Sequence, residues 1–325
     1  MRAILRKSFG GPQVLTVADH PAPKPRDGEV LIEVKAFGLN HAELYMRSGN
    51  WPEAAPISGI ECVGVVRACP GDEFKTGQKV VALMGGMGRT LNGSYAELTC
   101  VPASNVIAVE TEMPWDQLAA IPESYATAWA CLHGNLGITS GQWLLIRGAT
   151  SALGKAALNV AAHAGARVIA TTRRPDRLTE LDQLGAEHAL REGPELSRQV
   201  RELCAEGVDA VLELTGNSTL LNSMSVVRPG GRLCLAGFLG GLAPLSEFNP
   251  LLQMPSRVHF SFFGSFVFGT PGFPLSQVPM QKIVDHAQRG EYRAQPARVF
   301  RFEEIADAHR LMEAGQANGK LVVLV

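Results

Sequence analysis

Residues 143–165 are WLLIRGATSALGKAALNVAAHAG, which is an apolar run, a glycine-containing turn and an alanine-rich stretch in direct succession. The run Trp143–Arg147 predicts a strand. Lys155–Ala164 predicts a helix that ends before Gly165, a residue that accepts the left-handed conformation common just after helices. A strand, a turn of small residues and a helix in this order are typical of a dinucleotide-binding turn.

The turn RGATSALG at 147–154 matches the G-x-G-x-x-G pattern loosely, with Gly148 at its start and Gly154 as the glycine that packs the helix against the strand. Small residues between them leave the backbone N–H groups and the positive end of the helix open to a pyrophosphate. We therefore predict cofactor contacts at Thr150, Ser151, Ala152 and Leu153. A plain strand-to-helix turn is the alternative interpretation.

The end of the next strand distinguishes the two nicotinamide cofactors. In an NAD-specific site an acidic residue about 20 positions beyond the turn binds the ribose 2′-hydroxyl. Here Thr172, Arg173 and Arg174 occupy that region, and no carboxylate precedes Asp176. Guanidinium groups bind phosphate oxygens through a planar fork of charged donors, which favours NADPH. The alternative is that both arginines are solvated loop residues.

The pattern of the chain changes between its two parts. In the first 120 residues, Gly and Pro separate short β-like runs at 29–36, 62–69, 79–83 and 94–101, which is typical of a small barrel or sandwich. From Trp143 onward, strands alternate with helices and predict a parallel sheet, with strands at 143–147, 167–171, 210–214, 232–236 and 258–263. Towards the end we expect a loop at 265–278, helices at 280–289 and 303–314, and a last strand at 320–325.

Composition excludes several classes of partner. The 325 residues are enough for two domains with separate cores. With 30 basic and 31 acidic side chains, the net charge of −1 gives no general attraction to nucleic acid or anionic lipid. No signal-peptide pattern and no apolar run of ~18 residues occurs. We therefore expect a cytoplasmic protein with no membrane partner. The six cysteines include no CxxC pair, as expected of free thiols in a reducing compartment.

Several segments resemble the medium-chain dehydrogenase/reductase family, and most closely its zinc-free quinone oxidoreductases, or zeta-crystallin-like proteins. In chain order they are PAPKPRDGEVLIEVKAFGLNHAELYMRSG, GIECVGVV, FKTGQKVVAL, YATAWACL, the turn described above and IADAHRLMEAGQANGKLVV, so the resemblance covers essentially the whole chain. It implies an α/β fold in which a doubly wound, parallel Rossmann sheet is inserted into a GroES-like, β-barrel-type catalytic domain. The expected bounds are 1–122 with 266–325 for the catalytic domain and 123–265 for the Rossmann domain.

The resemblance also implies a cleft between the domains that holds the nicotinamide, and a homodimer formed by edge pairing of the last Rossmann strand. The segment HFSFFGSF at 259–266 would be an apt hydrophobic edge for this pairing. An internal strand is the alternative interpretation of the segment.

We expect no metal. Alcohol dehydrogenases of the family hold catalytic zinc with a Cys, a His-Glu pair and a third Cys or Asp, and the positions that resemble these are Asn40, Ile60 with Glu61, and Glu123. An amide and an isoleucine cannot assemble that tetrahedron. The cysteines of the structural zinc lobe are also missing. A shifted site is the alternative, but its spacing matches no known ligand pattern; it would use His41, Glu43, Glu61 and Cys62.

In the resembled subgroup, the Asn and Tyr of a G-x-N-x-x-x-x-Y segment line the cleft near the nicotinamide. They correspond here to Asn40 and Tyr45, which we expect to donate hydrogen bonds to a substrate oxygen. The alternatives are that Asn40 caps the following helix and that Tyr45 is half-buried packing.

The resemblance adds cofactor contacts. Thr127 in YATAW resembles a threonine near the nicotinamide, although it could instead be a helix residue bonded to its own backbone. Contacts are also expected where parallel strands end and near the C-terminus, at Gly237, Phe238, Phe263, Gly264 and Lys320. An exposed lysine is the alternative for Lys320. Where many quinone oxidoreductases have Asn-Tyr this chain has Arg191 and Glu192, so Arg191 either replaces the contact or is solvated.

Quinones and enones accept hydride without a Lewis acid, because the negative charge delocalises onto an oxygen that needs only hydrogen-bond donors. We therefore predict a zinc-independent, NADPH-dependent oxidoreductase acting on a quinone, an enone or a similar small electron-poor acceptor. One alternative is a non-enzymatic NADPH-binding redox sensor or crystallin-like protein. Another is an enoyl reductase acting on acyl thioesters, against which the even charge balance argues mildly.

Overall fold

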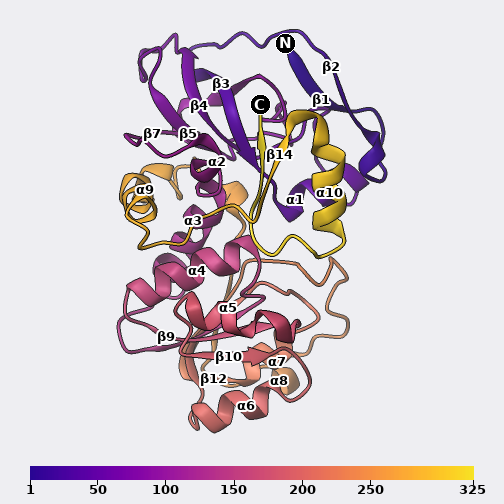
Figure 1. Cartoon of the computed structure of the whole chain (residues 1–325). Coiled ribbons are helices and arrows are strands. Elements are labelled where there is room, and N and C mark those ends of the chain that lie inside the picture. Colours follow the sequence, from indigo (N-terminus) through magenta and orange to yellow (C-terminus); the bar gives the residue numbers. More distant parts are fainter. The chain divides into compact units, whose positions relative to one another are not determined.

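The computed structural model describes residues 1–325, which form two compact units (Figure 1). The split unit consists of Met1–Ala126, Ser265–Gly290 and Ala294–Val325, and the inserted unit consists of Thr127–Gly264 and Glu291–Arg293. The expected domain bounds, 1–122 with 266–325 for one domain and 123–265 for the other, stay a prediction, because they describe domains that would fold independently. No helix in either unit combines the length and the apolar character needed to cross a bilayer.

The inserted unit is built on a six-stranded sheet. Its strands are β8 (Trp143–Arg147), β9 (Arg167–Thr172), β10 (His188–Arg191), β11 (Val208–Glu213), β12 (Val227–Leu235) and β13 (His259–Phe262). They lie in the order β10-β9-β8-β11-β12-β13, and every neighbouring pair is parallel. The chain order reverses between β8 and β11, as in doubly wound sheets. This confirms the predicted α/β class.

Helices surround this sheet: α4 (Ala152–His163), α5 (Leu178–Gln183), α6 (Leu196–Leu203), α7 (Leu220–Ser225) and α8 (Pro250–Gln253), as Figure 1 shows. Apolar side chains from four strands form the core on which they pack, including Leu145, Ile169, Val211 and Leu233. The six consecutive residues Ala156–Ala161 of α4 are all buried, which explains why this helix is so apolar. The sequence prediction began this helix at Lys155, which is three residues late. In the structure Ser151 caps the helix and Ala152 is its first residue.

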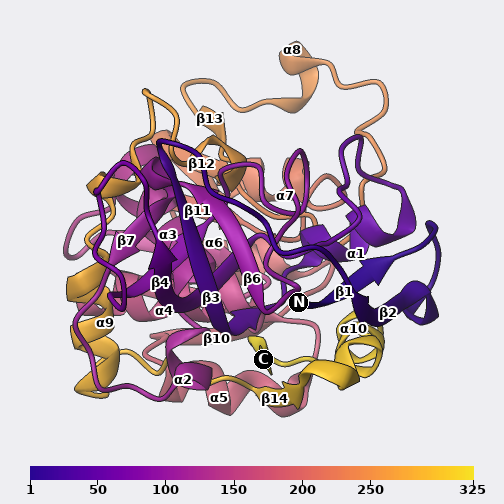
Figure 2. The same ribbon diagram turned by 90° about the horizontal axis from the view of Figure 1, so that it is seen from above.

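The split unit contains a seven-stranded sheet and a separate hairpin. The hairpin is β1 (Arg2–Arg6) with β2 (Leu15–Asp19), and the sheet holds β3 (Glu29–Gly38), β4 (Glu61–Ala68), β5 (Lys79–Leu83), β6 (Leu98–Pro102), β7 (Val106–Ala108), β14 (Arg298–Arg301) and β15 (Leu321–Leu324). The order is β14-β15-β3-β4-β5-β7, with β6 also on β3. Only β14 and β15 pair parallel. Figure 2 shows β3, β4 and β6 side by side.

Five helices complete the description: α1 (His41–Ser48), α2 (Trp115–Leu118), α3 (Pro122–Trp129), α9 (Met280–Gln288) and α10 (Ile305–Glu313). The first two pack in the split unit, and α3 runs across the boundary after Ala126 into the inserted unit. In both views α10 lies beside α1 and the hairpin (Figures 1 and 2).

Two predicted elements differ from the observed ones. The strand expected at 94–101 begins only at Leu98, because the backbone N–H groups of Ser94 and Tyr95 donate to Gly59 and Ser58 instead of to a neighbouring strand. The strand expected at 232–236 begins at Val227, five residues early, and passes through Gly230 and Gly231. Short 3-10 turns also interrupt the expected loop at 265–278, at Ser265–Val267 and Leu275–Gln277.

Candidate active site

The turn between β8 and α4 has the geometry that an anion requires. Gly148 has φ +78°, and a Cβ on Gly154 would lie 2.5 Å from the Gly148 carbonyl oxygen, so neither position accepts a larger residue. Ser151 caps α4: its Oγ accepts from the Gly154 N–H at 3.0 Å and donates to Gly148 O at 2.8 Å. The N–H groups of Ala152 and Leu153 belong to the first turn, where helices leave donors unpaired. They are the donors that could bind a pyrophosphate.

Arginines lie at the end of β9. Arg173 and Arg174 are exposed, whereas Thr172 is buried with its Oγ1 3.5 Å from Thr150 Oγ1. Arg174 pairs with Asp176 at 3.1 Å, in contact with solvent, so a phosphate would compete with only a weak surface ion pair. Arg177 was missed by the sequence prediction. Burial and, second, the charge of Arg174 lower the pKa of Arg177, which puts a third guanidinium beside this group.

A buried ion network joins the strand ends beneath the turn. Arg147, 2% exposed, donates to Glu192 at 3.1 Å and lies 3.9 Å from a Glu213 oxygen. Its remaining donors reach Asn222 and Ser223, both at 2.9 Å. Glu192 also accepts from Thr171 at 3.0 Å and therefore points inward, while the predicted cofactor residue Arg191 is exposed.

Glu213 ends β11 with both oxygens occupied. It accepts from the backbone N–H groups of Thr215 at 2.7 Å and Gly216 at 3.1 Å, and from the Ser223 hydroxyl. Burial is the largest effect on this carboxyl and raises its pKa. The network fixes the loop that follows β11, close to the predicted turn, and no motif in the sequence indicated it.

The other predicted cofactor residues of the inserted unit occupy different environments. A Cβ on Gly237 would lie 2.7 Å from Leu214 O, so close backbone packing explains this glycine. Phe238 is half-buried, with its ring 6.2 Å from that of Phe262. Phe263 is a core residue and Gly264 follows it. Thr127 is buried in α3, which fits both the predicted cofactor contact and the alternative of a helix residue bonded to its own backbone.

In the split unit, the predicted catalytic Asn40 precedes α1. It stands at the N-cap position, and its backbone N–H donates to Glu43 Oε2 at 2.8 Å, so its role at the helix start is confirmed. Its side chain points elsewhere, because Nδ2 donates to Glu61 Oε1 at 2.9 Å and Oδ1 accepts from Lys320 at 2.7 Å. The cap and the side-chain network therefore coexist in one residue.

Glu61 and Lys320 form a buried ion pair, with exposed side-chain fractions of 0% and 3%. The second Glu61 oxygen accepts from the Glu123 backbone N–H at 2.8 Å. The sequence assigned Lys320 to the cofactor or to the surface; its ammonium is enclosed within the split unit, so the exposed alternative is wrong.

Glu43 is the second carboxylate of this cluster. It is buried and accepts from the Ile60 backbone N–H at 3.2 Å. Burial raises the pKa of Glu43 to about 8, and the Glu61 charge adds to the rise while Lys320 opposes it. With the Glu43 pKa raised to about 8, Glu43 adds no second negative charge to the buried Lys320–Glu61 ion pair near neutral pH.

Tyr45 lies one turn and a half into α1. It is half-buried, and burial raises the pKa of its phenol, so the hydroxyl stays a proton donor at neutral pH. The predicted role in substrate binding and the packing alternative both fit this burial.

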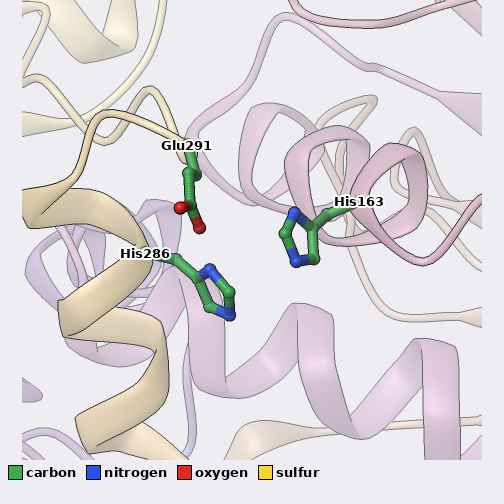
Figure 3. Close-up of side chains that lie close together, drawn as sticks. All are labelled: His163, His286 and Glu291. Atoms are coloured by element: carbon green, nitrogen blue, oxygen red, sulfur yellow. The ribbon is translucent and has the colours of Figure 1, made fainter.

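The residues at the family's catalytic zinc positions do not fit zinc. Ile60 offers no ligand atom, and the Lys320 ammonium already bonds both Asn40 and Glu61. In the shifted alternative, burial raises the pKa of the Cys62 thiol, which disfavours the thiolate that zinc requires. Figure 3 shows other metal-ligating side chains, His163 and Glu291 of the inserted unit and His286 of the split unit. Two donors from one unit are fewer than zinc needs.

Two family models match the chain: one described as alcohol dehydrogenase GroES-like domain, over residues 26–111, and one described as zinc-binding dehydrogenase, over residues 152–274. A similar curated protein is the quinone oxidoreductase of Sus scrofa, 28% identical over 338 residues that cover 100% of this chain and 98% of that protein.

Solved structures agree in fold over the whole length. A mycobacterial protein in complex with NADPH has a TM-score of 0.90 at 28% identity, and 100% of both chains is covered. An NAD-dependent alcohol dehydrogenase has a TM-score of 0.85 at 28% identity with the same coverage. The two named cofactors differ, so the cofactor preference of this chain must be argued from its own residues.

Proposed function

Because the chain belongs to the medium-chain dehydrogenase/reductase family, we propose that it is a zinc-independent oxidoreductase that transfers hydride from NADPH to a quinone, an enone or a similar small electron-poor acceptor. The observation that carries the proposal is the buried Lys320–Glu61 pair, whose ammonium bonds two of the residues, Asn40 and Glu61, at which the resemblance would put zinc ligands. Quinones and enones need no Lewis acid, so hydrogen-bond donors suffice.

In this proposal the cofactor pyrophosphate binds the N–H groups at the start of α4, from Thr150 to Leu153, where the helix dipole favours an anion. The remaining predicted contacts, in the turn, in the strand ends and near the nicotinamide, complete its site: Thr127, Thr172, Arg191, Gly237, Phe238, Phe263 and Gly264. The two compact units would then be the catalytic and the cofactor domain.

The preference for NADPH rests on the arginines after β9. Arg173 and Arg174 are exposed, Arg177 lies beside Arg174, and no carboxylate precedes Asp176. A cluster of guanidiniums favours the 2′-phosphate through charge-assisted, bidentate hydrogen bonds. The mycobacterial relative bound to NADPH supports the same preference.

At the acceptor, NADPH supplies the hydride, and the chain supplies orientation and hydrogen bonds. The Asn40 amide and the Tyr45 hydroxyl are donors that would stabilise negative charge as it develops on the substrate oxygen. The Tyr45 phenol keeps its proton at neutral pH because burial raises its pKa. Both residues come from α1 and the position before it, so one helix would set their spacing.

The test is to mix the purified protein with NADPH or NADH and a panel of quinones, enones, aldehydes and enoyl thioesters, while nicotinamide absorbance is followed. We expect oxidation of NADPH with quinones or enones and little with aldehydes. Turnover of enoyl thioesters alone would favour the enoyl-reductase alternative. Tight NADPH binding without turnover of any acceptor would favour the redox-sensor alternative.

Cofactor preference is tested separately by Arg173→Ala with Arg174→Ala. Loss of these two charges should raise the apparent constant for NADPH tenfold or more and that for NADH less than twofold. Equal changes for the two cofactors would overturn the proposed phosphate site.

We propose in addition that the protein is a cytoplasmic homodimer that pairs through β13. This strand is at the edge of its sheet, and Phe260 and Phe262 on it are 41% and 51% exposed. An unpaired apolar edge invites a second strand. Light scattering after size-exclusion chromatography should give twice the mass of the chain. Because the Phe263 N–H donates to Leu235 in β12, the alternate N–H groups face the open edge, and Phe260→Pro, which removes one of them, should give a monomer.

A further inference from the structure

We propose that Lys320 is a positioning residue for the acceptor site: its ammonium, held by Glu61, fixes the orientation of the Asn40 amide, so that one amide N–H stays available to a substrate oxygen. The inference rests on the proposed function, in which Asn40 contacts the acceptor.

Three side chains form a closed set of contacts. Lys320 Nζ donates to Asn40 Oδ1 at 2.7 Å and also to Glu61 Oε1. Asn40 Nδ2 donates to the same Glu61 oxygen at 2.9 Å. Each end of the amide therefore has a charged partner of the matching kind, a donor for its oxygen and an acceptor for its nitrogen.

Rotation of the amide by half a turn would be strongly unfavourable. It would set the NH₂ group against the ammonium and the carbonyl oxygen against the carboxylate, with two repulsive contacts in place of two charge-assisted ones. Because Lys320 and Glu61 are both buried, water cannot compensate for this exchange. The charged pair thus selects one of the two amide orientations.

The selected orientation leaves one donor with only a long, weak contact. An amide nitrogen carries two N–H groups, and one of them is taken by Glu61. The next acceptor, Glu43 Oε1, lies 3.5 Å from Nδ2, beyond the range of a good hydrogen bond. Asn40 is also the partly exposed member of the cluster, whereas its partners are enclosed. A substrate oxygen could reach this N–H without disturbing the ion pair.

Gly38 gives independent support, because it makes room for the lysine. A Cβ at this position would collide with Lys320 Cε and would lie 2.6 Å from Glu61 Oε1 and 3.0 Å from Ala119 O. Gly38 has no left-handed φ, so backbone conformation does not require a glycine there. The space is needed by the side chains of the cluster.

A cofactor contact for Lys320, expected from the sequence, makes a different prediction. If the ammonium bound the dinucleotide, its removal would weaken NADPH binding. If it acts through Asn40, its removal should lower turnover and leave NADPH binding unchanged.

The experiment is a double-mutant cycle of Asn40→Ala and Lys320→Met, with kcat for a quinone and the NADPH dissociation constant from fluorescence as readouts. We expect Lys320→Met to lower kcat at least tenfold and to change NADPH binding less than twofold. In the Asn40→Ala background, Lys320→Met should change kcat less than twofold, because the residue through which it acts is gone.

Two further variants guard against a merely structural effect. Glu61→Gln with Lys320→Met removes both buried charges and should show the same loss of kcat if Lys320→Met alone does not fold. Val323→Ala, on the buried face of β15 three residues away, should lower stability and keep kcat within twofold. Comparison of the stability and kcat of Val323→Ala with those of Lys320→Met shows how much a loss of stability alone changes turnover.

Additive losses in the cycle would overturn the inference, and so would a tenfold loss of NADPH binding with kcat retained. Both results would leave the proposed function intact, since the wild-type protein would still turn over quinone. If none of the acceptors supported oxidation of NADPH by the wild-type protein, the proposed function would be overturned. The inference would then fall with it.

Discussion

The inserted unit encloses Arg147 with Glu192 and Glu213, and the split unit encloses Lys320 with Glu43 and Glu61. Each cluster has one cation and two carboxyl groups, yet they differ in how far their hydrogen bonds are satisfied. The Arg147 guanidinium donates hydrogen bonds to Glu192, Asn222, Ser223 and a backbone oxygen. In the split unit, the amide N–H of Asn40 remains without a good acceptor.

The extent to which hydrogen bonds are satisfied distinguishes a charge cluster that stabilises a fold from one that can serve a binding site. A saturated network rigidifies its surroundings and offers nothing to a ligand. A network that contains one partly exposed donor without a good acceptor can donate a hydrogen bond to a ligand through that group. On this criterion the inserted-unit cluster supports the strand ends, and the split-unit cluster is the one that we propose to serve a substrate.

The largest effect should come from breaking the saturated cluster. Arg147→Met leaves two enclosed carboxylates without their cation and should lower the free energy of unfolding by about 3–5 kcal/mol. Urea denaturation measures the loss. Arg228→Met is the matched control, because its pair with Asp209 is partly exposed and should contribute about 1 kcal/mol or less. Equal losses in the two variants would remove the distinction between the clusters.

The second effect is a pH dependence confined to the split-unit cluster. Burial raises the pKa of Glu43 to about 8 from its ordinary value of 4.5, so the folded state binds the proton more tightly than the unfolded chain. The contribution of Glu43 to stability is complete below 4.5 and is lost as the pH rises through about 8.

Glu43→Gln keeps the size of the side chain and cannot ionise. The stability of this variant relative to wild type should therefore rise between pH 5 and pH 9, as measured by denaturation at several pH values. Asp209→Asn, in the inserted unit, is the control for general pH effects. A constant difference across the range would show that Glu43 is ionised in the folded protein.

A smaller effect is expected from the phenol beside the cluster. Tyr45→Phe should reduce turnover of a quinone several-fold and change the free energy of unfolding by less than about 1 kcal/mol, since only a hydroxyl is removed. Tyr292→Phe, a buried tyrosine of the inserted unit, is the comparison. Unchanged kinetics for Tyr45→Phe would remove this residue from the substrate site.

The smallest effect should follow metal removal. Since the Lys320 ammonium already bonds Asn40 and Glu61 and Ile60 offers no ligand atom, dialysis against a chelator should leave both the activity and the melting temperature unchanged. Elemental analysis of protein prepared without chelator is the companion measurement. Stoichiometric zinc, or activity that returns only when zinc is added, would contradict the proposed metal-independent chemistry.

Local patterns predicted the features that depend on neighbouring residues. The strand β8, the capped turn and the helix α4 follow one another in sequence, so their periodicity and small residues indicated them directly. The absence of zinc ligands could also be predicted, because it depends only on which residue types stand at four positions.

The charge clusters could not be predicted in this way. Arg147 and Glu213 end separate strands, and either one resembles an ordinary solvated residue until the sheet brings them together. Lys320 is 259 positions from Glu61, and nothing near it in the sequence distinguishes a buried ammonium from a surface one. Arg177 had a signal, since it is the third arginine of RRPDR, but the pattern for the phosphate site considered only the first two.

The position of β15 has a consequence for biosynthesis. This strand lies between β14 and β3 inside the sheet, and Lys320 immediately precedes it. A ribosome that has released the first 300 residues has therefore exposed a sheet with a missing interior strand and two carboxyl groups with no counterion. The inserted unit can fold earlier on its own residues, but the split unit should complete its sheet and its charge cluster only after Lys320 and β15 have left the exit tunnel.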